Sequence, residues 1–162
     1  MLSCVFPGSF DPVTKGHLNL ITRASGIFDQ VTVTLMINIH KKGSLSAEKR
    51  IELLQTACRH LQNVKIDSWN GLLADYMKEK NEHVIIRGLR GTEELEHEMY
   101  AAAANKILND GIETVFLLTD PAMSGISSST VREIAAFQGD ISEFVPDGLA
   151  EDILPLLSKK QK

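Results

Sequence analysis

Three stretches of the sequence place residue types that bind phosphate at or shortly after the ends of short apolar runs: "PGSFDPVTKGH" (7–17), "IRGLRGTEE" (86–94) and "GISSSTVRE" (125–133). The first supplies glycines, a serine and a histidine, the second two arginines around a glycine, and the third three consecutive serines. Backbone N–H groups, guanidinium groups and hydroxyls are the usual partners of phosphate oxygens. None of the stretches offers an obvious nucleophile. The pattern therefore predicts a site that binds and positions phosphates.

The first stretch reads as a junction between a strand and a helix. A helix beginning near Thr14 or Lys15 would point its free N–H groups and its positive dipole end at a ligand. His17 would lie in the first turn, where the dipole disfavours the imidazolium form but leaves a neutral ring able to donate a hydrogen bond. The spacing alone leaves an alternative open, in which the glycines and Asp11 form a turn and His17 is a surface residue.

Arg87 and Arg90 bracket Gly88 directly beyond an apolar run. Guanidinium groups are poorly placed there for packing but well suited to bidentate phosphate binding, and Gly88 allows close approach. The alternative is a surface salt bridge to one of the glutamates that follow, Glu93, Glu94 or Glu96.

Other positions are candidates on weaker grounds. Lys41 and Lys42 follow the second apolar run, and the spacing does not choose between a ligand and an ordinary solvated lysine. In the third stretch Thr130 and Glu133 fit a capping box, although Ser129 could cap instead. Three serines in a row exceed what a cap requires. Glu98 would lie about one helical turn from the 88–90 loop.

The elements that must position these residues alternate along the chain. β-branched or apolar runs at 2–6, 31–37, 64–67, 83–87 and 114–118 are separated by segments with helical spacing, from which we expect helices. Strand and helix in alternation predict a Rossmann-like, doubly wound sheet of five parallel strands with helices on both faces. We expect one domain over 1–162, with a frayed tail at 158–162. Ligands of such sheets bind beyond the carboxyl ends of the strands, where the three stretches fall.

Composition and missing motifs exclude several classes. Neither G-x-G-x-x-G after the first strand nor G-x-x-x-x-G-K-[ST] is present, which argues against a dehydrogenase and a P-loop kinase. The formal charge of −4 provides no general attraction to nucleic acid or to an anionic membrane, so neither is an expected partner. With no membrane-length apolar run and no basic leader, we expect a cytoplasmic protein.

Taken together, the motifs resemble those of the nucleotidylyltransferases. Thr14, Gly16 and His17 fill their [HT]-x-G-H signature after a G-[ST]-F-D-P turn. The threonine form, with "IRGLR" at 86–90 and "ISSS" at 126–129, is similar to the bacterial phosphopantetheine adenylyltransferases. The resemblance covers residues 2 to about 147, with the motifs in order.

This resemblance implies a Rossmann-like enzyme of coenzyme A synthesis. It would move AMP from ATP to 4′-phosphopantetheine by direct in-line attack, without a covalent enzyme intermediate, and release 3′-dephospho-CoA and pyrophosphate. Mg²⁺ would be carried by the ATP phosphates rather than by a protein cage. The resemblance also implies ATP, 4′-phosphopantetheine and dephospho-CoA or CoA as ligands, and a homohexamer.

The family's roles carry over to matching positions. His17, Lys41 and Arg87 would be catalytic, with His17 at the α-phosphate and Lys41 and Arg87 at the phosphate of phosphopantetheine. Ser9 would contact both substrates and Leu73 the pantetheine arm. The ATP site would comprise Ser9, Phe10, His17, Gly88, Leu89, Arg90, Glu98, Met123, Ser124, Gly125, Ile126, Ser127, Ser128 and Ser129.

The sequence departs from the family at three positions. His97, Gly125 and Leu45 stand where aromatic residues are usual, which bears on adenine or pantetheine packing. Two rival functions stay in view. One is transfer of AMP or CMP to nicotinamide mononucleotide or glycerol phosphate, although those enzymes usually carry H-x-G-H. The other is a non-catalytic nucleotide or CoA sensor, which would have no need of His17.

Overall fold

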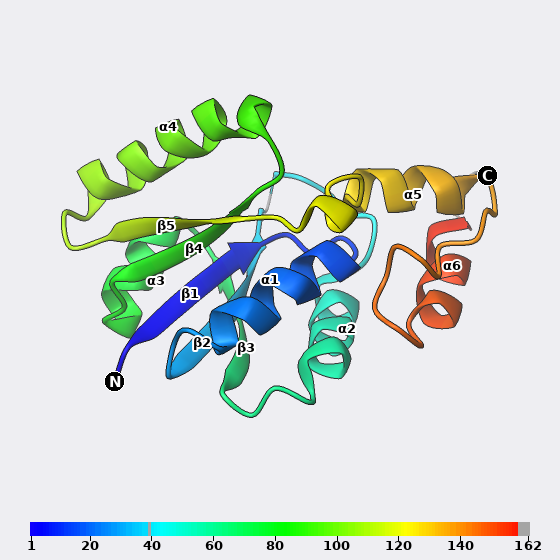
Figure 1. Ribbon diagram of the computed structural model, residues 1–162, viewed down its shortest axis with the longest axis horizontal. Helices are drawn as coiled ribbons and strands as arrows, with labels where there is room; N and C mark the ends of the chain where they lie inside the picture. The colour runs from blue at the N-terminus through cyan, green and yellow to red at the C-terminus, as the bar shows by residue number, and fades with distance from the viewer. Residues whose placement is uncertain (39, 159–162) are drawn as a thin grey trace.

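A computed structural model describes residues 1–38 and 40–158 (Figure 1). Strands and helices alternate as the sequence predicts. The strands are β1 (Ser3–Gly8), β2 (Gln30–Ile37), β3 (Val64–Asn70), β4 (Val84–Leu89) and β5 (Glu113–Leu118). The helices are α1 (Lys15–Ser25), α2 (Ala47–Cys58), α3 (Leu73–Lys80), α4 (Thr92–Leu108), α5 (Ser128–Ala136) and α6 (Ala150–Ser158), with a short 3₁₀ turn at Pro121–Met123. Of the predicted tail, Ser158 ends α6 and residues 159–162 lie outside the described residues.

The five strands form one parallel sheet in the order β3-β2-β1-β4-β5. The order reverses between β1 and β4, which is the switch point where ligands of such sheets bind. β1 pairs with β2 over its whole length, from Ser3↔Gln30 to Gly8↔Leu35, but its register with β4 is the single pair Val5↔Ile85. The two central strands therefore separate toward their carboxyl ends.

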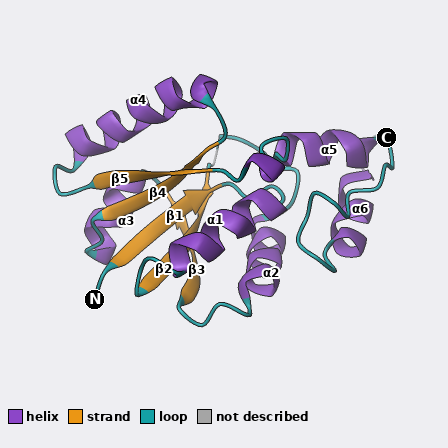
Figure 2. Cartoon of the chain, in the orientation of Figure 1, coloured by secondary structure: helices purple, strands orange, loops and turns teal. Residues whose placement is uncertain are grey.

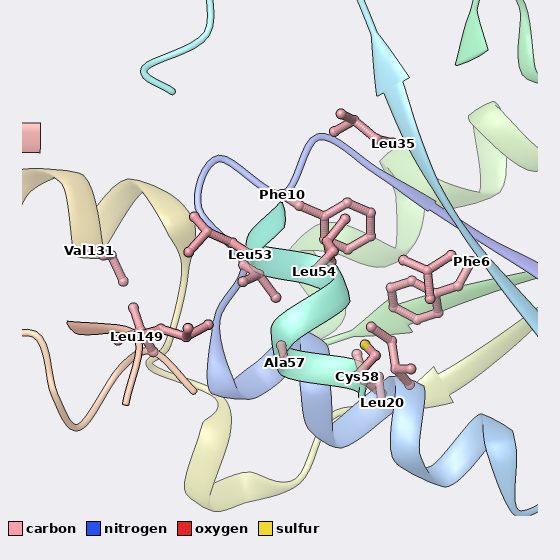
Figure 3. Close-up of a cluster of buried hydrophobic side chains, with 14 of the residues drawn as sticks. Phe6, Phe10, Leu20, Leu35, Leu53, Leu54, Ala57, Cys58, Val131 and Leu149 are labelled. Carbon is pink, nitrogen blue, oxygen red and sulfur yellow. The ribbon is translucent and has the colours of Figure 1, made fainter. Parts of the chain in front are cut away.

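Helices cover both faces of the sheet, which confirms the predicted fold class (Figure 2). Side chains of β1 alternate between the faces, because successive residues of a strand point in opposite directions. Cys4 and Phe6 join a large apolar cluster with side chains of α1, α2, α5 and α6, part of which Figure 3 shows. Val5 joins a smaller cluster with α3 and β4.

Three strands run further than the apolar runs suggest. β1 continues through Pro7 and Gly8, β3 to Asn70 and β4 through Gly88 and Leu89. The reason is pairing: β2 offers partners up to Leu35 for β1 and up to Ile37 for β3, and β5 offers partners up to Leu118 for β4. Residues expected in loops, Gly88 among them, therefore stand on strand ends.

Among the described residues, no helix combines the length and the apolarity that crossing a lipid bilayer requires.

Candidate active site

A pocket of about 520 Å³ opens at the carboxyl ends of β1 and β4 and extends to the start of α5. It brings together most of the residues predicted to bind nucleotide, from four separate parts of the chain. These are Ser9, Phe10, His17, Gly88, Arg90, Glu98, Ile126, Ser127, Ser128 and Ser129. Arg87, predicted to bind the phosphate of phosphopantetheine, lines the same pocket.

A second pocket of about 300 Å³ adjoins the first and shares a wall with it. The shared residues are Pro7, Gly8, Ser9, Arg87, His97 and Glu98. Beyond this wall the second pocket continues to Leu73, as predicted, and to Met36 near the end of β2. Two ligands placed in the two pockets would meet beside Ser9 and Arg87.

Five predicted site residues line neither pocket: Lys41, Leu89, Met123, Ser124 and Gly125. Leu89 is a buried core residue whose carbonyl accepts a hydrogen bond from the Thr119 N–H (2.8 Å). Met123 ends the short 3₁₀ turn, and Ser124 and Gly125 connect it to Ile126, which lines the larger pocket. Lys41 is exposed in the segment after β2, where its N–H donates to the Asn38 carbonyl (3.1 Å). Their roles stay predictions.

Thr14 and His17 form a capping box at the start of α1. The Thr14 hydroxyl accepts a hydrogen bond from the His17 N–H (3.3 Å), and the Thr14 N–H donates to His17 Nδ1 (3.1 Å). The spacing of three residues within T-x-G-H is the spacing that a capping box requires, with histidine in place of the usual glutamate. Because Nδ1 accepts, the ring proton belongs on Nε2, and His17 is a neutral donor.

The surroundings of His17 keep it neutral. Its ring packs edge-on against the buried Phe10 ring, with 5.0 Å between centroids. Burial, followed by the positive charges of Arg87 and Arg90, lowers the pKa of His17 from 6.5 to about 4. At neutral pH the ring is therefore uncharged and donates to a ligand through Nε2–H alone.

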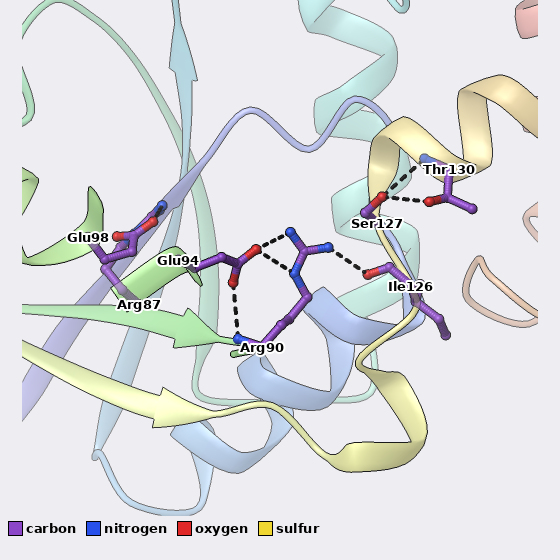
Figure 4. A network of polar contacts seen from close by, with 7 residues as sticks. All are labelled: Arg87, Arg90, Glu94, Glu98, Ile126, Ser127 and Thr130. Atoms are coloured by element: carbon purple, nitrogen blue, oxygen red, sulfur yellow. Dashed lines mark hydrogen bonds and ion pairs between the residues drawn. The ribbon is translucent and has the colours of Figure 1, made fainter. Parts of the chain in front are cut away.

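The two arginines are both held by glutamates of α4 (Figure 4). Arg87 donates to Glu98 through Nε (2.8 Å) and Nη2 (2.6 Å), and its Nη1 reaches the Pro7 carbonyl (2.8 Å). Arg90 binds Glu94 through its side chain and its backbone N–H. Of the salt bridges weighed from the sequence, the one between Arg90 and Glu94 is present, whereas Arg87 pairs with Glu98, which was not among the partners considered. Both guanidinium groups also line the pocket.

The serines at the start of α5 have separate partners. Ser127 is the N-cap and accepts from the Thr130 N–H (3.0 Å), so the capping box of Thr130 with Glu133 and the cap by Ser129 are both wrong. The extended backbone that an N-cap requires falls at Ser127, one residue before the helix begins. Ser128 donates to the Pro12 carbonyl (2.7 Å), and Ser129 accepts from Arg132 Nη2 (3.1 Å).

Arg132 is a positively charged pocket residue that the sequence reasoning missed. It lies on α5, lines the larger pocket, and donates through Nη1 to the Asp11 carbonyl (2.6 Å). Its position three residues after Ser129 places it on the same helix face, and that spacing was the available signal. With Arg87 and Arg90 it makes three arginines around one pocket.

Among residues 1–38 and 40–158, no group of three His, Cys, Asp or Glu side chains is arranged to hold a metal ion. The pocket carboxylates Glu94 and Glu98 are each bound to an arginine.

Comparisons with known proteins agree with this site. The "Cytidylyltransferase-like" family model matches residues 5–134. The chain is 48% identical over 149 residues to a phosphopantetheine adenylyltransferase of Finegoldia magna, covering 92% of each protein. It is 44% identical over 159 residues to one of Clostridium novyi, covering 98% of this chain and 99% of that protein.

A crystal structure from Vibrio parahaemolyticus, named a "Putative Nicotinate-nucleotide Adenylyltransferase", has the same fold, with a TM-score of 0.71. At 17% identity, over 99% of this chain and 98% of that one, it is evidence of the fold alone. The identities near one half over almost the whole length decide the family: the chain belongs to the phosphopantetheine adenylyltransferases, within the cytidylyltransferase-like group.

Proposed function

We propose that this protein moves AMP from ATP to 4′-phosphopantetheine, giving 3′-dephospho-CoA and pyrophosphate. The observation that carries the proposal is the pair of pockets with a common wall at Ser9 and Arg87. The larger, with its arginines and a neutral histidine donor, suits a nucleoside triphosphate. The smaller, which continues to Leu73 and Met36, suits an uncharged arm that ends in a phosphate at the shared wall.

The reaction asks the site mainly to position two anions and to stabilise charge. The acceptor phosphate is already ionised, so no general base is needed before it attacks the α-phosphorus of ATP in line with the leaving pyrophosphate. No covalent enzyme intermediate is required. His17 Nε2–H would donate to an α-phosphate oxygen, where charge develops in the transition state. Arg87, at the shared wall, would bind a phosphate oxygen between the two substrates.

The remaining predicted residues complete this picture. Lys41 would bind the acceptor phosphate from the segment after β2, while Ser9 would face both substrates. Arg90, Glu98 and the residues from Ile126 to Ser129 would hold the nucleotide, together with the predicted contributions of Leu89 and of Met123 to Gly125. Arg132 would add positive charge near the triphosphate.

Mg²⁺ fits this site as a companion of ATP. Because Glu94 and Glu98 are engaged by arginines, the ion would be held by phosphate oxygens and water, as Mg²⁺ commonly is. It would neutralise charge on the triphosphate.

Self-association is part of the proposal. α4 is 17 residues long, yet none of its residues is buried, and Met99, Tyr100, Ile107 and Leu108 are among its exposed side chains. A patch of this kind marks an interface between proteins. It supports an assembly through α4, for which the homohexamer is our prediction; a cytoplasmic location is likewise a prediction.

Pyrophosphate release tests the function directly. Mg·ATP is offered with 4′-phosphopantetheine, nicotinamide mononucleotide or glycerol 3-phosphate in separate reactions. We expect turnover with the first alone. Turnover with either of the others but not with phosphopantetheine would refute the proposal, and ATP binding without any turnover would favour the sensor.

A further inference from the structure

Two buried charged side chains, Asp11 and Arg50, join the β1–α1 loop to the segment that carries Lys41. Each is only 8% exposed. A buried charge is costly unless hydrogen bonds compensate it, so both positions call for an explanation. Neither belongs to the predicted catalytic or binding set, and neither lines a pocket described above.

Asp11 binds the segment after β2 from the side of the loop. Its Oδ2 accepts from the Ser44 N–H (2.6 Å) and its Oδ1 from the Leu45 N–H (2.7 Å). These two residues lie just before α2, whose N-terminus favours a carboxylate. Hydrogen bonds to an ionised group are about twice as strong as neutral ones, so this contact fixes the end of the 40–45 segment firmly.

Arg50 makes the reciprocal connection from α2. Its Nη1 donates to the Ser9 carbonyl (2.9 Å), and its Nε lies 3.4 Å from the Ser46 carbonyl. Thus Asp11 of the β1–α1 loop binds the 40–45 segment, and Arg50 of α2 binds the β1–α1 loop. We call Asp11 and Arg50, with their bonds to Ser9, Ser44 and Leu45, the crossed clamp.

The loop is also fixed from its other side. The Asp11 carbonyl accepts from Arg132, and the Pro12 carbonyl accepts from Ser128, both on α5. The loop that carries Ser9 is therefore held in place relative to the larger pocket. The segment that carries Lys41 gains its placement relative to Ser9 through the crossed clamp.

We infer that Asp11 and Arg50 are positioning residues, which set the place of the Lys41 ammonium relative to Ser9 and hence to the acceptor phosphate. The inference rests on the proposed function, because it assigns Lys41 to that phosphate. A misplacement of about 1 Å can cost roughly a hundredfold in rate, so loss of the clamp is expected to lower kcat without contact between either residue and substrate.

The test is a double-mutant cycle of Asp11→Asn with Lys41→Ala, assayed by pyrophosphate release with saturating Mg·ATP. If Asp11 acts through Lys41, Asp11→Asn lowers kcat/KM for phosphopantetheine roughly ten- to a hundredfold alone but less than about threefold in the Lys41→Ala background. The dissociation constant of ATP, measured by calorimetry, changes less than about threefold in Asp11→Asn, since the larger pocket keeps its lining.

Controls separate positioning from folding. Asp140→Asn makes the same chemical change at a carboxylate in another loop, where Oδ1 accepts from the Ser142 N–H (2.9 Å), and is expected to leave kcat/KM unchanged. If Asp11→Asn fails to fold, Arg50→Gln removes the clamp from the other side, with Arg50→Lys as the conservative variant that restores part of the activity.

Equal losses from Asp11→Asn in both backgrounds would overturn the inference, and so would a loss of ATP affinity that matches the loss of kcat/KM. Failure of the proposed function looks different: the wild-type protein would not turn over phosphopantetheine, or Lys41→Ala would be as active as wild type.

Discussion

His17 uses its two ring nitrogens for different purposes. Nδ1 accepts from the Thr14 backbone and holds the ring, which leaves the Nε2 proton for a ligand. A turn with a surface histidine, the alternative that the sequence left open, does not describe this geometry: His17 is part of the helix cap and lines the larger pocket. Its capping role follows from the T-x-G-H spacing, but its lowered pKa depends first on burial in the fold and then on the positive charges of Arg87 and Arg90, which lie far away in the sequence.

Replacement of His17 by asparagine or glutamine separates the two nitrogens. In His17→Asn the amide oxygen of the shorter side chain can replace Nδ1 as the acceptor but supplies no donor at the Nε2 position, whereas His17→Gln reaches that position. We expect His17→Asn to lower kcat roughly 10²- to 10³-fold with the ATP dissociation constant little changed, and His17→Gln to keep more activity. Steady-state kinetics and calorimetry check this. Weaker ATP binding with kcat preserved would contradict it.

The lowered pKa of His17 predicts a pH dependence of stability. Above about pH 6.5 the ring is neutral in both the folded and the unfolded state and contributes nothing. Between pH 6.5 and about 4 the unfolded state binds a proton at His17 that the folded state does not. The free energy of unfolding therefore decreases as the pH is lowered through this range. The full loss is at most about 3 kcal/mol.

Urea unfolding at a series of pH values measures this loss, with His17→Asn as the reference that lacks the titrating ring. The difference between the two proteins isolates His17 from the carboxylates. Parallel stability curves for wild type and His17→Asn between pH 6.5 and 4 would contradict the lowered pKa.

At the scale of elements, the sequence predicted which segments are strands and helices better than where they end. Alternating apolar runs and helical spacing are local signals, while strand ends depend on how far the neighbouring strand continues. The cap of α5 could not be chosen among neighbouring hydroxyls, because all of them suit the position chemically. The partner of Arg90 depended on the phase of α4, which brings Glu94 rather than Glu93 or Glu96 toward it.

Gly88 is needed for helix packing as well as for access to the pocket. A Cβ at this position would lie 2.3 Å from Leu20 Cδ1 on α1, so the buried Leu20 side chain would have to shift. We expect Gly88→Ala to lower the free energy of unfolding by about 1–3 kcal/mol. In a Leu20→Ala background the same change should cost less, since the space is open.

Urea unfolding measures both costs. Gly91→Ala is the matched control, because its Cβ would meet nothing within 4 Å. Equal costs of Gly88→Ala in the two backgrounds, or an equal cost of Gly91→Ala, would show that the contact with Leu20 is not the cause.

For the whole molecule, the doubly wound architecture and the family were within reach of the sequence and are confirmed. The division of the site into two pockets could not be predicted from the sequence. It depends on the separation of β1 and β4 after Val5 and on the hydrogen bond from Arg87 to the Pro7 carbonyl. Nor did helical spacing reveal the exposure of α4. Spacing indicates an apolar side of a helix, but not whether the chain itself supplies the surface that covers it.

Exposure of α4 predicts self-association. Ile107 is 85% exposed, so a charge placed there should disturb contacts between copies while leaving the fold intact. We expect Ile107→Asp to convert the assembly to smaller species in size-exclusion chromatography with light scattering, and Gln62→Asp, at an exposed polar position, to leave it unchanged. A monomeric wild-type protein, or an unchanged mass for Ile107→Asp, would contradict the prediction.

The single register pair between β1 and β4 has one more consequence. Long ladders join β1 to β2 and β2 to β3, and another joins β4 to β5. The sheet therefore consists of two groups of strands, whose register pairing at the boundary between β1 and β4 is short. The larger pocket lies across the boundary between β1 and β4, with Gly8 and His17 on one side and Arg87 and Arg90 on the other. A bound nucleotide would thus contact both groups of strands at once, and its binding would stabilise their association within the sheet.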